Sequence, residues 1–134
     1  MGDRTSVRVE VWHEDVIKFV EILDPVMLCE DSRGLKSWLL FEDDEVNYAG
    51  WSELQAAAQE GCRFHGSHGS GGDYDAREFC SDGEGFYNLP INDSGGYSIP
   101  VTIDPGWQNP RVEFDTLMAL QKFCQVMRDL LAMK

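Results

Sequence analysis

Residues 5–12 read TSVRVEVW, and this stretch decides the class of fold. Valines occupy every second position from Val7 to Val11, and Arg8 and Glu10 stand between them. A period of two is typical of a strand with one buried face and one solvated face. The sequence therefore predicts a half-buried strand close to the N-terminus.

The residues that follow this strand predict a helix and then a hairpin. Acidic residues precede apolar residues with helical spacing from Val16 to Leu23, and a proline ends the pattern. Two apolar runs, 26–30 and 36–42, come next, and the residues DSRGL between them suit a turn. We expect these two runs to pair as antiparallel strands.

A short alanine-rich helix is expected over residues 52–60. Ser52 and Gln55 have the spacing of a capping box, and Gly61 can take the left-handed conformation that ends a helix.

The C-terminal part predicts a strand over 97–103 and then a long helix. Asn109 and Pro110 suit the first turn of that helix, which runs toward the C-terminus. The apolar residues that helical spacing places on its core-facing side are Leu117, Leu120, Cys124, Met127 and Leu131, with Phe114, Phe123 and Leu130 beside them.

Together these elements predict an α+β fold. It would consist of a small, mostly antiparallel sheet with the short alanine-rich helix and the long C-terminal helix packed on it. We expect residues 1–134 to form a single domain. Within it, residues 61–96 are rich in Gly, Asp and Ser and predict a long irregular segment of the kind that often carries function.

The charge of the chain indicates the kind of partner it meets. The chain has 24 acidic and 11 basic residues, a formal net charge of −13. A negative field of this size repels nucleic acid and anionic membrane and attracts basic protein surfaces. The alternative is an acidic surface that only maintains solubility.

Several negative features point to a soluble cytoplasmic protein. No apolar run reaches the length of about 20 residues that a membrane span needs. The N-terminus lacks the apolar stretch of a secretory signal, and Cys29 and Cys124 stand in apolar settings that are typical of reduced thiols.

Two acidic segments that contain aromatic residues are the predicted partner-binding sites. Carboxylates can pair with lysine and arginine, and large aromatic side chains can anchor an interface once they are desolvated. The first segment contributes Glu42, Asp43, Asp44, Glu45, Tyr48 and Trp51. The second contributes Asp73, Tyr74, Asp75, Glu78, Asp82 and Glu84.

Residues 62–80 offer a metal site as an alternative. Thiolate and imidazole are ligands of tetrahedral zinc, and two residues separate Cys62 from His65 and His65 from His68, with Cys80 further along. The second pair of ligands that zinc modules normally have is missing, so we expect no cofactor. The glycine-rich residues 66–72 match neither a serine-hydrolase elbow nor a phosphate loop.

We therefore predict an acidic, non-enzymatic protein inhibitor that occludes a basic partner, such as a nuclease or another nucleic-acid-binding protein. In general character the chain resembles bacterial immunity and antitoxin proteins and phage-encoded inhibitors of host nucleases and CRISPR complexes. The alternatives are a small metal-dependent enzyme that uses the 62–80 loop and an acidic adaptor subunit of a larger complex. The sequence leaves the oligomeric state open.

Overall fold

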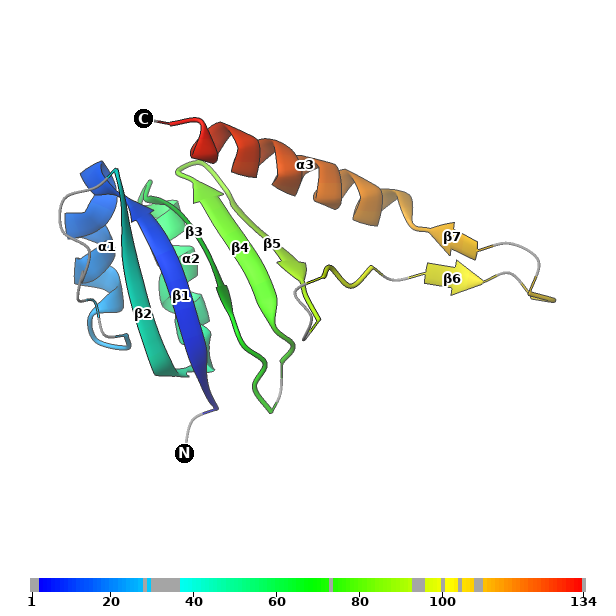
Figure 1. Ribbon diagram of the computed structural model, residues 1–134, viewed down its shortest axis with the longest axis horizontal. Helices are drawn as coiled ribbons and strands as arrows, with labels where there is room; N and C mark the ends of the chain where they lie inside the picture. The colour runs from blue at the N-terminus through cyan, green and yellow to red at the C-terminus, as the bar shows by residue number, and fades with distance from the viewer. Residues whose placement is uncertain are drawn as a thin grey trace.

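A computed structural model describes residues 3–27, 29, 37–72, 74–92, 96–99, 101–103, 105–107 and 110–133. Its largest element is a five-stranded sheet in which every neighbouring pair is antiparallel, in the order β2-β1-β3-β4-β5 (Figure 1). The strands are β1 (Arg4–Trp12), β2 (Trp38–Asn47), β3 (Arg63–His68), β4 (Arg77–Asp82) and β5 (Phe86–Pro90). A separate two-stranded sheet pairs β6 (Val101–Ile103) with β7 (Pro110–Val112). The predicted α+β fold is confirmed.

Helices cover both faces of the large sheet. On one face lie α1 (Val16–Leu23), preceded by the short helix η1 (His13–Asp15), and α2 (Trp51–Gln59), preceded by η2 (Tyr48–Gly50). On the other face lies α3 (Phe114–Leu131), which packs against β3, β4 and β5. The expected packing of the long C-terminal helix on the sheet is therefore present.

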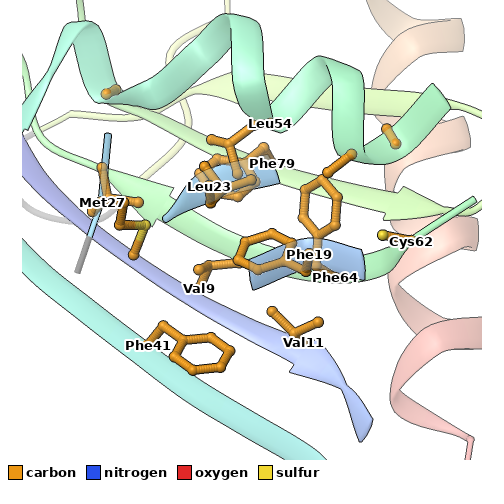
Figure 2. Close-up of a cluster of buried hydrophobic side chains, with 14 of the residues drawn as sticks. Val9, Val11, Phe19, Leu23, Met27, Phe41, Leu54, Cys62, Phe64 and Phe79 are labelled. Carbon is orange, nitrogen blue, oxygen red and sulfur yellow. The ribbon is translucent and has the colours of Figure 1, made fainter. Parts of the chain in front are cut away.

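The main core lies between the sheet and the helices α1 and α2. Alternation along β1 directs Val7, Val9 and Val11 to this face, as the sequence predicts. Figure 2 shows the strand residues Phe41, Phe64 and Phe79 in the same cluster as Phe19 and Leu23 of α1 and Leu54 of α2. The rings of Phe19 and Phe64 are 5.5 Å apart between centroids.

A smaller core lies under α3. The helix buries Phe123, Val126 and Leu130 against Cys80 and Leu89 of the sheet. The predicted core stripe is therefore displaced, because Phe114, Leu117, Cys124 and Leu131 are exposed and Leu120 and Met127 are only partly buried. The helix also begins at Phe114 rather than near Pro110, since Pro110 belongs to β7.

The predicted irregular segment 61–96 is wrong over three stretches, because β3, β4 and β5 lie within it. Glycine is unusual inside a strand, and here it has a steric reason. A Cβ added at Gly66 would lie 2.1 Å from the carbonyl oxygen of Arg8 on β1. The small residue thus permits the pairing of β3 with β1.

The predicted hairpin between 26–30 and 36–42 is wrong for the residues that the structure describes. The second run contributes to β2, but β2 pairs with β1. Val26 and Met27 instead donate backbone hydrogen bonds to the carbonyl of Leu23 and close α1. Residues 28 and 30–36 lie outside the described residues.

The two ends of α2 differ in how well the sequence predicts them. Gly61 has a φ of +90° and follows the helix as expected. Ser52 lies inside the helix, whose N-cap is Gly50 without a side-chain cap, so the predicted capping box does not form.

Candidate functional site

A hollow of about 210 Å³, called here the aromatic pocket, lies at one end of the large sheet. The strand register brings its parts together, because β1 pairs Arg4 with Asn47, and His68 pairs with both Val7 and Arg77. The residues that line it are Tyr48, Ala49, Trp51, His68, Tyr74, Asp75 and Arg77. Tyr48 and Trp51 of the first predicted segment therefore meet Tyr74 and Asp75 of the second.

A run of three left-handed residues shapes the rim of the aromatic pocket. Tyr48, Ala49 and Gly50 have φ angles of 50°, 57° and 62°. This conformation costs an L-residue other than glycine roughly 1–2 kcal/mol. The amide of Tyr48 donates to the carbonyl of Asp3 over 2.6 Å, which anchors the run to the start of β1. As a result Ala49 enters the core while Tyr48 stays 52% exposed at the rim. Backbone strain of this kind is concentrated at binding sites.

His68 and Trp51 form an aromatic wall of the pocket. Their rings meet edge to face with centroids 5.2 Å apart, and Tyr74 contacts His68 from another side at 5.6 Å. His68 Nδ1 lies 2.7 Å from the carbonyl oxygen of Gly69, so this nitrogen carries the proton and donates it. Burial lowers the pKa of His68 below its ordinary value. The ring is therefore a neutral aromatic surface at neutral pH.

The charged groups of the pocket are Asp75 and Arg77. The carboxylate of Asp75 is on an exposed residue, whereas Arg77 is half-buried and its Nη1 donates to Asn88 Oδ1 over 2.7 Å. The hydroxyl of Tyr74 donates to the carbonyl of Asp3 over 3.1 Å, which fixes this ring in place. Aromatic faces beside a carboxylate have the chemistry that receives a lysine or arginine side chain.

The acidic run 42–45 lies within β2 and continues the strand beyond the predicted apolar run 36–42. Glu42, Asp44 and Glu45 are exposed, and Asp43 is half-buried. Asp43 Oδ1 accepts a hydrogen bond from the amide of Glu45 over 3.0 Å. Since β2 is an outer strand of the sheet, the run places carboxylates along an edge that ends at Tyr48.

The remaining carboxylates of the second segment are spread over the sheet. Glu78 accepts a hydrogen bond from the hydroxyl of Tyr97 over 3.2 Å. Asp82 lies at the opposite end of β4 from the pocket, where its Oδ1 accepts hydrogen bonds from the amides of Glu84 and Gly85 and stabilises a turn. Asp73 lies outside the described residues. The structure therefore does not gather this segment into one cluster.

The four candidate metal ligands do not surround a common point. Cys62 and His68 flank the inner face of β3 and lie six positions apart, which corresponds to about 20 Å along a strand. His65 pairs with Cys80 on the opposite face. Burial raises the pKa of Cys62 to about 11 and that of Cys80 to about 12. Among the residues that the structure describes, no group of three or more His, Cys, Asp or Glu side chains could hold a metal ion.

Arg77 and Ala49 belong to the aromatic pocket but are not predicted from the sequence. The stretch REFCSD at 77–82 forms β4, in which three consecutive residues are buried, so no alternation of polar and apolar residues marks the strand or places Arg77. The left-handed Ala49 has no sequence signal, because alanine normally avoids this conformation.

Comparison with protein-family models, with curated proteins and with solved structures finds no match for this chain. None of the helices in the described parts of the chain is long and apolar enough to cross a membrane.

Proposed function

We propose that this chain is a non-enzymatic inhibitor that binds a basic protein and blocks the surface with which that protein grips phosphates. The partner would be a nuclease or another nucleic-acid-binding protein, as for immunity proteins, antitoxins and phage-encoded inhibitors. The aromatic pocket carries this proposal, because it joins three large aromatic side chains and the carboxylate of Asp75 in an acidic chain, while the cation that lines it, Arg77, donates to Asn88.

In this mechanism a lysine or arginine side chain of the partner enters the aromatic pocket. A cation over the faces of Tyr48, Trp51 and Tyr74 gains on the order of 0.5–2 kcal/mol, and most when it is desolvated. The carboxylate edge of β2 lies next to the pocket and attracts the basic surface around that side chain. Since the partner's cations then contact carboxylates, they are no longer available to nucleic acid.

Two variants of the tagged protein test this proposal. Tyr48→Asn removes an exposed aromatic ring, and asparagine tolerates the left-handed backbone at this position. Ile17→Ala is the matched control, because Ile17 is 78% exposed on α1, outside the pocket.

The parent protein and the Ile17→Ala variant should retain one basic protein from a cell lysate at low salt and release it at high salt. The Tyr48→Asn variant should retain much less of it. Equal retention by all three proteins would exclude the aromatic pocket as the anchor. A retained partner that is acidic and insensitive to salt would favour the adaptor alternative.

A further inference from the structure

A second candidate surface lies on a projection beyond β5. Figure 1 shows β6, β7 and the start of α3 extending beyond β5, away from α1 and α2. We call this projection the arm and define it by the described residues 97–99, 101–103, 105–107 and 110–119. It carries most of the large apolar side chains that are exposed in the described chain, namely Tyr97, Ile99, Val101, Ile103, Trp107, Val112, Phe114, Leu117 and Met118.

Trp107 lies in the segment that connects β6 to β7, and its side chain is 83% exposed. Its φ angle is 61°, a left-handed conformation that bulky residues rarely adopt. The strained backbone holds the largest apolar side chain of the arm in solvent. Such strain persists where function requires it.

The arm also differs from the rest of the chain in charge. Residues 1–96 contain 20 acidic and 7 basic residues, whereas residues 97–134 contain four of each. The full net charge of −13 therefore belongs to the first 96 residues. The described residues of the arm contain Glu113, Asp115 and Arg111, a net charge of −1, so two copies of this chain repel each other least through the arm.

An apolar groove lies at the base of the arm, where α3 leaves the sheet. Its volume is about 310 Å³, and it is formed by β5, by the residues that lead into β6 and by one side of α3. Leu89, Ile99 and Ala119 contribute to its walls. A groove of this size, at the lower end of the range of about 300–1,000 Å³ for ligand pockets, accommodates one large side chain.

We infer that the chain forms a symmetric homodimer in which two arms pack antiparallel about a twofold axis. This arrangement places the tip of each arm at the base of the other, so that each Trp107 enters the groove of the second copy. A twofold interface is self-complementary, and the arm carries both halves of the contact.

The exposed aromatic side chains supply part of the area that such a dimer needs. Trp107 and Phe114 are 83% and 72% exposed, so together they present roughly 300 Å², since an aromatic side chain buries about 150–250 Å². The aliphatic residues of the arm add to this area. A partner in a standard interface contributes about 800 Å².

Charge distinguishes the two molecules that could bind the arm, a second copy of this chain and the basic partner. A basic surface is attracted mainly to the first 96 residues and gains little electrostatic energy from an arm whose described residues carry a net charge of −1. Added salt should therefore affect the two contacts in opposite directions. It weakens the binding of a basic partner and strengthens a dimer of two acidic chains, because it screens their mutual repulsion.

Sedimentation equilibrium of the full chain tests the dimer without any other protein. We expect a monomer–dimer equilibrium whose dissociation constant falls as salt rises. Trp107→Ala should raise this constant at least tenfold, whereas the control Ile17→Ala, in another exposed apolar residue, should leave it unchanged. A parent protein that stays monomeric at high concentration and high salt would overturn the inference, and so would equal effects of the two variants.

A mixing experiment tests the reciprocal contact itself. Ala119→Trp fills the groove but keeps the Trp107 side chain at the tip of the arm. Trp107→Ala keeps the groove open but removes that side chain. Each variant alone lacks both tip-in-groove contacts, while a mixed pair retains one. Native mass spectrometry should therefore detect more heterodimer than either homodimer. A statistical mixture or no dimer at all would contradict the proposed geometry and would leave the inhibitor proposal unaffected.

Discussion

Arg63 at the start of β3 donates three hydrogen bonds to the carboxylate of Asp15. Its backbone amide and its Nε bind Oδ2 over 2.9 Å and 2.8 Å, and its Nη2 binds Oδ1 over 3.2 Å. Asp15 immediately precedes α1, so this contact joins the start of the first helix to the third strand. The same hydrogen bonds raise the pKa of Arg63.

Replacing Asp15 with alanine should lower the free energy of unfolding by about 2–3 kcal/mol, because hydrogen bonds between charged groups contribute about 1.5–3 kcal/mol and these are only partly screened. Urea denaturation measures this loss. Glu14→Gln is the control, since Glu14 is an exposed partner of Arg63 at 3.4 Å and should contribute less than about 1 kcal/mol. Equal effects of the two variants would argue against a special role for Asp15.

Gly66→Ala should unfold the protein or cost more than about 4 kcal/mol, the range of the most damaging single substitutions. The reason is steric, since the new Cβ would meet the backbone of Arg8 and Val9. Gly72→Ala is the matched control, because its Cβ would lie no closer than 3.6 Å to the side chain of Asp3. Circular dichroism during thermal unfolding distinguishes them. A stable Gly66→Ala protein would show that β3 does not approach β1 in this way.

Phe123→Ala should cost about 3–5 kcal/mol through lost burial and a cavity. At protein concentrations at which the chain is monomeric, Leu117→Ala should be nearly neutral, because Leu117 is exposed on the part of α3 that belongs to the arm. Chemical denaturation of both variants checks the register of the helix. A larger loss for Leu117→Ala would instead favour the core stripe that the sequence predicts.

The contrast between β1 and β3 shows how far the sequence predicts this fold. Strand β1 is predicted because its apolar residues alternate on one buried face. Strand β3 reads RFHGSH, and its glycine and polar residues resemble a loop. Position 66 requires glycine because a Cβ there would collide with the backbone of Arg8. These two residues are far apart in the sequence. The aromatic pocket is predicted in part for the same reason, because Tyr48, Trp51 and Tyr74 have a sequence signal and Arg77 depends on the strand register.

Acidification below about pH 6.5, the ordinary pKa of histidine, should destabilise the protein. Burial lowers the pKa of both His65 and His68, so the unfolded chain binds protons at a higher pH than the folded chain. The free energy of unfolding is thus unaffected by these groups above that pH and falls as the pH decreases toward their folded values. Urea titrations between about pH 7.5 and 5.5 measure the slope.

The double variant His65→Gln/His68→Phe supplies the control for this pH dependence. It should remove most of the slope in that range, since neither replacement titrates. A parent protein whose stability is constant or rises on acidification would contradict the assignment of the two histidines as buried neutral rings.

Replacing Glu42, Asp44 and Glu45 with their amides should slow association with a basic partner several-fold at low salt and change dissociation much less. Asp43 is kept, because its carboxylate accepts the Glu45 amide. The control removes Glu21, Glu53 and Glu60 of the helical face in the same way, with circular dichroism to confirm folding. Stopped-flow measurements should give different association rates for the two triple variants. Identical rates would show that the β2 carboxylates contribute only through the net charge.

The same carboxylates have a consequence for polymerisation. Strand β2 ends the sheet, and the outer edge of such a strand is a template on which another chain can add a strand. Closely spaced negative charges on it oppose that addition, because an incoming β2 of another molecule would bring carboxylates next to carboxylates. Replacing Glu42, Asp44 and Glu45 with their amides weakens this protection, so fibril growth of that variant should begin from β2.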